Sequence, residues 1–268
     1  MTAVPLTRID SLRPLLNGRP LGLFSDIDGT LSPIVERPED ATVTPRCRSL
    51  LQSLIREDVR VALITGRPLT SARAMVGIDE VAYAANHGLE YWLDGRVELA
   101  EGVEGYPALV EQIVTQSAYL PELGVQPERK GPGVALHFRR APDTEAARAA
   151  ILRAIDSPAA QHFAIREGRK VIELRPDVNA SKGSATKLLA KRLGVKAILC
   201  MGDDRTDIDM FEAVKHLCNR GVDGAAVAVL SAESPPELLA ASDYTVEGVE
   251  GVEWLLGEVL RAVGGTSP

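Results

Sequence analysis

Two aspartates stand one residue apart at the end of an apolar run. The run Leu21–Ser25 is followed by Asp26 and Asp28, and then by Gly29 and Thr30. Residues two apart on an extended chain point to the same side, roughly 6–7 Å apart at a rise of ~3.3 Å per residue, so both carboxylates can address one ligand. One can attack phosphorus as a nucleophile, while the other exchanges protons with the leaving oxygen and with water. Taken alone, the pair also fits a solvated turn whose aspartates cap a helix.

Two further segments carry groups that bind anions. Thr65 ends the apolar run "VRVALI", and its hydroxyl can donate to a phosphate oxygen, as can the amides of the turn at Gly66 and Arg67. Lys182 lies in the first turn of an expected helix, where the helix dipole disfavours a cation, so an anion shared with the helix amides would explain its position. Alone, these signals also fit an ordinary turn and a solvated surface lysine.

A second acidic cluster follows another apolar run, in "AILCMGDDRTDIDMF". Carboxylate oxygens suit Mg²⁺, which prefers near-octahedral oxygen ligands. We expect Asp203, nearest the strand end, to bind the metal, and Asp207 to orient a lysine or a metal-bound water. Asp204 is expected to lie behind the metal ligands. Asp209 is expected to cap a helix or face solvent. A nucleophile, a proton donor, phosphate donors and a metal site together predict hydrolysis of a phosphate ester, a slow reaction that requires charge neutralisation and positioning.

The elements that carry these residues alternate between strands and helices. Four short apolar runs end in polar or Gly-rich turns, as buried parallel strands do. Helical patterns at 45–57, 181–194 and 205–215 lie between or after them. This alternation predicts an α/β fold with a doubly wound parallel sheet, whose ligands bind at the carboxyl ends of the strands.

The middle of the chain has a different pattern. Strand-like segments surround helical patterns at 106–120 and 143–155, and the turns at 94–95 and 167–170 predict antiparallel hairpins. We expect an inserted α+β domain at 89–176 and a discontinuous core formed by 1–88 and 177–268.

In combination and order, "DIDGTL", "ITGR", Lys182 and "GDDRTD" resemble the four motifs of the haloacid dehalogenase (HAD) superfamily of phosphohydrolases. Within it the chain is similar to the trehalose-6-phosphate phosphatase family, through "DGTLSPIVERPEDA", "NHGLEYW", "ERKGPGVALHFR" and "VIELRP". The resemblance implies that Asp26 is the nucleophile, that Asp28 is the general acid/base, and that Thr65 and Lys182 hold the phosphoryl group. It also implies Mg²⁺ bound by Asp26, the main chain of Asp28, and Asp203.

The same resemblance implies a function for the insert, as a C2-type cap that closes over the sugar. Substrate contacts would come from the core turn and junction and from the cap: Gly66, Arg67, His87, Gly88, Glu128, Lys130, Arg139 and Glu173. Without the resemblance, the charged cap residues would be read as surface charges. Ile208 and Ser181 depart from the family pattern at positions where glutamate and aspartate are common, which leaves the sugar less certain than the reaction.

Composition restricts the partners. A net charge of −7 and a pI near 5.3 argue against sequence-independent nucleic-acid binding, which needs clustered basic residues. Three widely spaced cysteines indicate no disulfide framework. Without a secretory h-region or a run of ~20 apolar residues, the expectation is a cytoplasmic protein with no membrane partner. The resemblance also implies functional coupling to a trehalose-phosphate synthase-like glycosyltransferase.

The leading hypothesis is therefore Mg²⁺-dependent hydrolysis of trehalose 6-phosphate through an aspartyl-phosphate. Alternatives with the same chemistry act on glucosylglycerol phosphate, sucrose phosphate or a trehalose-like pseudo-disaccharide phosphate. A phosphomutase would pass the phosphoryl group to a second sugar. A non-catalytic sugar-phosphate sensor is a fourth option, although every catalytic group is present.

Overall fold

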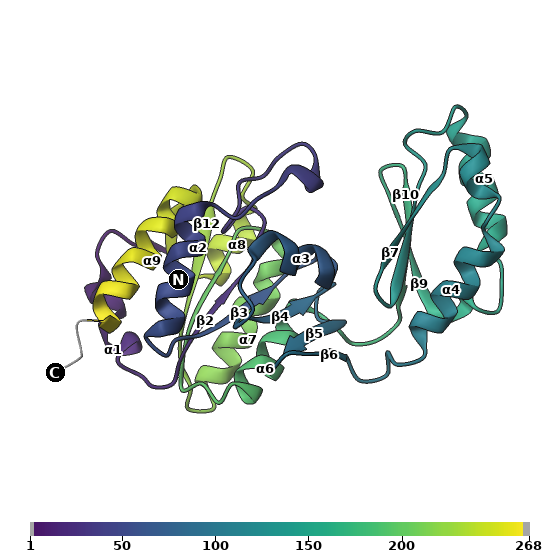
Figure 1. Ribbon diagram of the computed structural model, residues 1–268. Coiled ribbons are helices and arrows are strands. Elements are labelled where there is room, and N and C mark those ends of the chain that lie inside the picture. Colours follow the sequence, from purple (N-terminus) through teal and green to yellow (C-terminus); the bar gives the residue numbers. More distant parts are fainter. Residues whose placement is uncertain (1–2, 265–268) are drawn as a thin grey trace. The chain divides into compact units, whose positions relative to one another are not determined.

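A computed structural model describes residues 3–264 of the chain, which divide into two compact units (Figure 1). One comprises the residues up to Glu98 together with those from Ala180 onward, and the other is Leu99–Asn179. We call them the core unit and the insert unit. No helix within residues 3–264 combines the length and apolar character needed to cross a membrane.

The core unit contains a nine-stranded sheet in the order β1-β13-β12-β11-β2-β3-β4-β5-β6. Along this order, every neighbouring pair from β1 through β13, β12, β11, β2 and β3 to β4 is parallel, and β5 pairs with β4 in the antiparallel direction. Their bounds are β1 Val4–Pro5, β2 Leu21–Ser25, β3 Arg60–Ile64, β4 Ala82–Ala85, β5 Glu90–Leu93, β6 Arg96–Leu99, β11 Ala197–Gly202, β12 Asp223–Leu230 and β13 Tyr244–Glu247. The predicted α/β class with a parallel sheet is confirmed.

Helices lie on both faces of this sheet (Figure 1). Alternate strand residues such as Leu23 and Leu199 form one core cluster with α2 and α9, whereas α6 and α7 pack together and contact strands of the same sheet. The central strands are buried on both faces, which explains their continuous apolar runs. The helices are α1 Arg13–Leu16, α2 Pro45–Arg56, α3 Leu69–Val76, α6 Lys182–Arg192, α7 Ile208–Cys218, α8 Pro236–Ala241 and α9 Gly248–Gly264.

The insert unit is a four-stranded antiparallel sheet in the order β7-β8-β10-β9, with α4 and α5 packed on one face. Val134, Leu136, Ile172 and Leu174 point into this apolar layer. The residues between them alternate to the opposite face, as strand geometry requires. The elements are α4 Tyr106–Gln116, β7 Gln126–Lys130, β8 Gly133–His137, α5 Thr144–Ala154, β9 Phe163–Gly168 and β10 Val171–Pro176.

One segment lies elsewhere than expected. The sequence analysis assigns the hairpin that turns at 94–95 to the insert, but its strands β5 and β6 extend the core sheet beyond β4. Tyr91 and Leu93 are buried there, and Tyr83 on β4 is opposite Trp92. Amphipathic alternation predicts a hairpin but does not say which sheet buries its apolar side. The division into a phosphatase core and a substrate-specificity cap stays a prediction.

Candidate active site

The parallel register brings the two acidic strand ends together. Strand β11 pairs with β2 so that Met201 is opposite Ser25. The next residue of β2, Asp26, donates its backbone N–H to the Met201 carbonyl at 3.0 Å. Asp26 and Asp203 therefore emerge side by side at the carboxyl edge of the sheet, where ligands of such folds bind.

Lys182 lies at the centre of this acidic edge. Its Nζ is 2.9 Å from Asp26 Oδ1 and 2.7 Å from Asp207 Oδ1. All three side chains are buried, with exposed fractions of 3%, 6% and 0% for Lys182, Asp26 and Asp207. Burial of a lysine that holds two carboxylates excludes the solvated surface lysine that the sequence left open.

Lys182 reaches this position because its helix begins there. Ser181 caps α6 by accepting hydrogen bonds from the Gly183 and Ser184 amides, and Ser184 bonds back to the Ser181 amide. A Cβ on Gly183 would stand 2.5 Å from the Asp209 carbonyl oxygen, so glycine lets α6 pack closely against the start of α7. Ser181 thus performs the capping that the more common aspartate would perform.

Asp207 is fully occupied by its neighbours. One oxygen binds Lys182, and the other accepts the amides of Asp203 and Asp204 at 2.9 and 3.0 Å. Asp203 is half-buried, and one of its oxygens accepts a long hydrogen bond from the Thr30 hydroxyl at 3.4 Å. One oxygen each of Asp26, Asp203 and Asp207 lies within 4.8 Å of the other two, so the group is compact enough to hold a metal ion.

The electrostatics leave this cluster with excess negative charge. Burial raises the pKa of Asp26 well above its usual value, against the attraction of Lys182. Burial, with Asp207 and Asp204 nearby, raises the pKa of Asp203 to about 7. The pKa of Lys182 is raised despite its burial, because Asp26 and Asp207 stabilise the ammonium. The pKa of Asp204 is lowered despite partial burial, because Lys182 and the Thr206 donors stabilise its carboxylate. One lysine thus faces several carboxylates, a balance that a cation would correct.

Gly29 is needed where the chain passes Asp203. Its φ of +78° lies in the left-handed region, and a Cβ there would stand 1.9 Å from Asp203 Oδ2. Sequence reasoning did not single out Thr30, which is completely buried beside the same carboxylate. Its position two residues after Asp28 was the sequence signal that could have indicated a place near the acidic cluster.

The Thr65 turn is held by a second turn at 86–88. The amide of His87 donates to the Thr65 carbonyl, and that of Asn86 donates to the Arg67 carbonyl, both at 2.9 Å. Asn86, His87 and Gly88 all have positive φ. A Cβ on Gly66 would stand 2.6 Å from His87 Nε2, so the imidazole lies against the Gly66 backbone. His87 therefore supports the turn that is expected to bind phosphate.

Arg67 is paired with the expected acid/base. Its guanidinium binds both oxygens of Asp28, with Nε and Nη2 each at 2.7 Å. A substrate contact for Arg67 stays a prediction, and the observed partner is the expected acid/base. The Thr65 hydroxyl accepts the Arg67 amide at 3.1 Å.

On the open face of the insert sheet, Glu128, Lys130 and Glu173 come together as a charged cluster. Lys130 Nζ is 2.9 Å from Glu173 and 3.9 Å from Glu128. His137 Nε2 is 2.8 Å from Glu128, a contact that sequence reasoning missed although strand alternation places His137 on this face. Burial opposes ionisation of Glu173, but Lys130 and His137 help to hold its pKa below the usual value. Arg139 is exposed in the turn after β8, outside this cluster.

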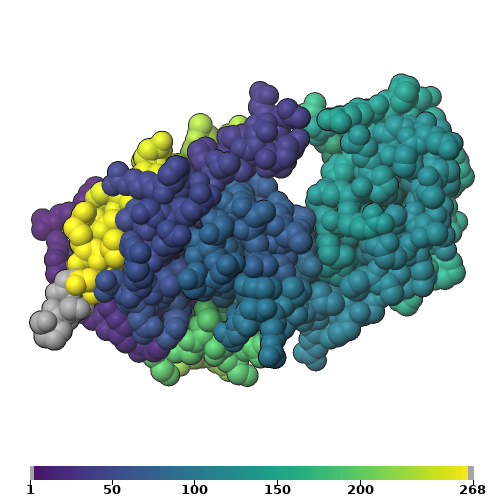
Figure 2. All heavy atoms as spheres, viewed as in Figure 1, coloured from purple at the N-terminus to yellow at the C-terminus, as the bar shows by residue number. Residues whose placement is uncertain are grey.

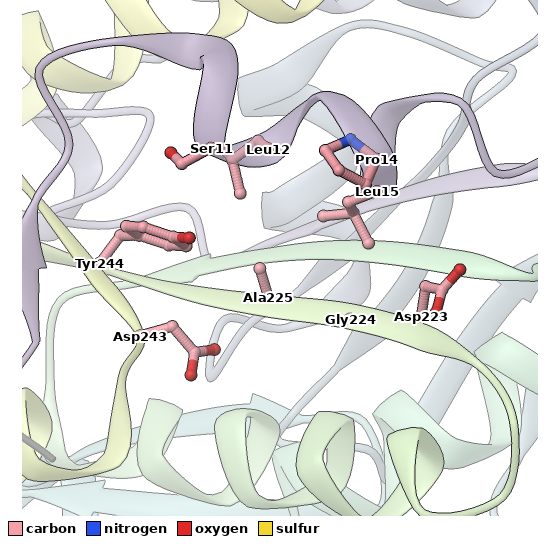
Figure 3. Close-up of a pocket in the computed structure, with 9 residues that line it drawn as sticks. All are labelled: Ser11, Leu12, Pro14, Leu15, Asp223, Gly224, Ala225, Asp243 and Tyr244. Atoms are coloured by element: carbon pink, nitrogen blue, oxygen red, sulfur yellow. The ribbon is translucent and has the colours of Figure 1, made fainter.

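A pocket of about 360 Å³ lies at the other end of the strands (Figure 3). Asp223, Asp243 and Tyr244, at the starts of β12 and β13, line it together with Leu12 and Leu15. Its two carboxylates would repel a phosphate. This pocket therefore does not suit a phosphate ligand.

Comparison with known proteins identifies the family. The family model described as trehalose-phosphatase matches residues 24–244, most of the chain. The chain belongs to the trehalose-phosphatase family. A trehalose-phosphate phosphatase of Mycobacterium leprae is 34% identical over 254 residues, which is 86% of this chain and 58% of that protein. The chain thus spans little more than half the length of this curated relative.

Solved structures show the shared fold. The crystal structure of a trehalose-6-phosphate phosphatase related protein matches with a TM-score of 0.70 at 20% identity, over 92% of this chain and all of that one. A haloacid dehalogenase-like hydrolase from Bacteroides thetaiotaomicron matches at 0.59 and 15% identity, over 89% and 98% of the two chains. At these identities the likeness concerns fold alone, and it confirms the predicted HAD-like architecture.

Proposed function

We propose that this chain hydrolyses trehalose 6-phosphate to trehalose and phosphate, with Mg²⁺ and an aspartyl-phosphate intermediate. The observation that carries the proposal is the buried group of Asp26, Lys182, Asp207 and Asp203 at the carboxyl edge of the sheet. Membership of the trehalose-phosphatase family supports the choice of sugar.

Each core residue has a role that fits its contacts. Asp26 Oδ attacks phosphorus, and the bond from phosphorus to the sugar oxygen breaks. Asp28 gives its proton to that oxygen, then takes one from the water that hydrolyses the aspartyl-phosphate. Lys182 holds a phosphoryl oxygen while Asp207 fixes its ammonium. The Thr65 hydroxyl and the following amides donate to the remaining oxygens.

The residues present fit Mg²⁺. Asp26 and Asp203 offer oxygens in one compact group, whereas Asp207 already uses both oxygens on Lys182 and two amides. We therefore assign Asp26, Asp203 and the main chain of Asp28 as ligands, with Asp207 and Asp204 behind them. When bound, the ion would supply positive charge to the phosphoryl oxygens.

The insert unit would supply the sugar contacts. Glu128, Lys130 and Glu173 present alternating charges on one sheet face, which suits a ligand covered with hydroxyl groups that donate and accept hydrogen bonds. We propose the same role for Arg139. His87 and Gly88 would act indirectly, by supporting the turn at Thr65 and Gly66.

A glycosyltransferase that makes trehalose 6-phosphate would supply the substrate. We propose functional coupling to such a synthase, and a cytoplasmic location in which both would work. Fractionation of cells that express the tagged full-length chain tests the location, and recovery in the membrane fraction would contradict it.

The test is a phosphate-release assay on a panel of sugar phosphates with Mg²⁺. We expect the highest kcat/KM with trehalose 6-phosphate, loss of turnover with EDTA, and loss of turnover in Asp26→Asn. Sucrose 6-phosphate, glucosylglycerol phosphate and a pseudo-disaccharide phosphate serve as competitors. A higher kcat/KM on one of these would overturn the substrate but keep the chemistry. Binding without turnover would indicate a sensor, and a phosphorylated second sugar would indicate a mutase.

A further inference from the structure

The Arg67–Asp28 pair is the tightest interaction that the expected acid/base makes. Both contacts are 2.7 Å, and the two groups meet as a planar fork, the geometry that arginine favours over lysine. The exposed fractions are 14% for the Arg67 side chain and 31% for Asp28. Because the pair is partly shielded from water, its attraction is screened less than that of a fully exposed surface pair.

Arg67 also connects Asp28 to a segment that follows it in the chain. Its Nη2 donates to the Pro38 carbonyl oxygen at 3.0 Å, in addition to Asp28. Pro38 begins the short 3₁₀ helix η2, Pro38–Asp40, within the exposed segment 33–40. In Figure 2 this dark-purple segment stands out from the surface of the core unit. Its Ile34 is 71% exposed. One guanidinium thus joins the nucleophile turn, the Thr65 turn and this projecting segment.

The position of Arg67 itself is fixed by the backbone. Its amide donates to the Thr65 hydroxyl, and its carbonyl accepts the amide of Asn86. The guanidinium therefore extends from a turn held on two sides. By contrast, Asp28 follows Ile27 at the start of a sharp turn, in which Gly29 has positive φ. Without Arg67, the Asp28 carboxylate would be free to rotate among its rotamers at the edge of the site.

We propose that Arg67 is a positioning residue for Asp28. Arg67 fixes the orientation from which the Asp28 carboxyl group begins each proton transfer, and it couples that group to segment 33–40. The inference rests on the proposed function, because it needs Asp28 to protonate a leaving group. It assigns Arg67 a role through Asp28 and not through a direct contact with the sugar.

The bidentate pair also defines the change that turnover requires. A proton carried on the guanidinium-facing side of either Asp28 oxygen would point at an Arg67 N–H, so a carboxyl protonated there gives up one of the two contacts. Arg67 keeps the other and limits how far the carboxyl turns. Loss of Arg67 should therefore slow the displacement of a leaving group that needs a proton from Asp28, and should leave the displacement of one that needs no proton unchanged.

Two substrates with different leaving groups separate these two cases. Trehalose departs as an alkoxide and needs a proton, whereas 4-nitrophenolate departs without one. We expect Arg67→Met to lower kcat on trehalose 6-phosphate by about 10- to 100-fold, the range for misplacement of a catalytic group. The change in KM should stay below threefold. The pre-steady-state burst of 4-nitrophenolate from 4-nitrophenyl phosphate should also change by less than threefold.

A double-mutant cycle with Asp28→Asn tests whether Arg67 acts through Asp28. In the Asp28→Asn background, Arg67→Met should cause no further loss on trehalose 6-phosphate. Equal losses on both substrates, or additive losses in the cycle, would show a general structural role and overturn the inference. Arg67→Lys keeps the charge but not the bidentate geometry, so its kcat on trehalose 6-phosphate should lie between those of wild type and Arg67→Met. It replaces Arg67→Met in the cycle if Arg67→Met does not fold.

A matched control and a second readout complete the design. Arg73→Met removes another arginine–carboxylate pair of the core unit, the one with Asp79. It should change kcat on trehalose 6-phosphate and the burst of 4-nitrophenolate by less than twofold. Deuterium exchange of segment 33–40 should be several-fold faster in Arg67→Met and unchanged in Arg73→Met, and equal exchange would refute the coupling. If wild type prefers another alkyl phosphate from the panel, the cycle uses that substrate. Failure of the sugar assignment is then distinct from failure of the inference.

Discussion

Removing Lys182 tests the buried charge cluster most sharply. In Lys182→Met the carboxylates of Asp26 and Asp207 lose the ammonium that lies 2.9 and 2.7 Å from them, and both stay buried. Breaking a buried pair by removing one partner costs about 3–5 kcal/mol, because the remaining charge is left uncompensated. That is a large share of the ~5–15 kcal/mol that holds a typical domain folded. We expect a loss in this range at pH 7 without metal.

The loss should depend on pH. In wild type Lys182 opposes the burial that raises the pKa values of Asp26 and Asp207, so without it those pKa values rise further above the unfolded value of 3.8. An acid whose folded pKa is raised destabilises the fold as pH increases from the unfolded pKa through the folded one. The deficit of Lys182→Met should therefore be smaller at pH 5 than at pH 8.

The assay is urea unfolding in EDTA, followed by tryptophan fluorescence. The chain has two tryptophans, Trp92 and Trp254, and both belong to the core unit, so the signal reports that unit alone. Lys187→Met is the control, since Lys187 is exposed on the same helix and its loss should change the free energy of unfolding by less than about 0.5 kcal/mol. A deficit below about 1 kcal/mol for Lys182→Met, or one that grows toward acid pH, would refute the reasoning.

Four further predictions use the same structure. Gly77 has a φ of +66° and open space around it, so Gly77→Ala should lower the free energy of unfolding by about 1–2 kcal/mol from backbone strain alone. Gly29→Ala should in addition displace the Asp203 side chain and abolish phosphate release. Normal turnover by Gly29→Ala would contradict this. The pKa of Asp203 is raised to about 7, so the metal-free wild type should lose folding free energy as pH rises from about 4 to 7. In urea unfolding with EDTA, Asp203→Asn should lose less folding free energy over that interval. Equal pH slopes would count against the raised pKa of Asp203. Asp203→Asn should also abolish the rise in Tm that Mg²⁺ gives wild type, and an undiminished rise would exclude Asp203 as a ligand. Lys130→Met should raise KM for trehalose 6-phosphate about tenfold or more, the effect of losing ~1.5–3 kcal/mol of charged hydrogen bonding, while leaving 4-nitrophenyl phosphate turnover unchanged; equal effects on both would remove Lys130 from sugar recognition.

The grouping of Asp26, Lys182, Asp203 and Asp207 follows from the sequence because it depends on topology. Apolar runs that end in acidic turns predict parallel strands, and parallel strands share a carboxyl edge. The lysine at the start of α6 was a further signal, because the helix dipole disfavours a cation there unless anions lie nearby. The structure adds that both carboxylate oxygens of Asp207 accept hydrogen bonds, one from Lys182 and the other from two backbone amides. Residue types alone do not reveal this geometry.

Other features depend on contacts that no local pattern encodes. The Arg67–Asp28 fork forms between two turns that are 39 residues apart, and its direction depends on side-chain rotamers. The approach of His137 to Glu128 depends on the register of β7 against β8. The β5–β6 hairpin has the alternation of a half-buried strand pair, but this pattern does not reveal that β5 pairs with β4 in the core sheet.

The central claim is that Asp26 takes the phosphoryl group from trehalose 6-phosphate. The most direct measurement mixes wild-type protein with trehalose 6-phosphate and Mg²⁺, quenches with acid within the first turnover, and locates the phosphoryl group by mass spectrometry of the peptides. The account predicts one phosphoryl group on Asp26, and none in Asp26→Asn or with EDTA. Release of phosphate without labelling of Asp26, or full turnover by Asp26→Asn, would contradict it.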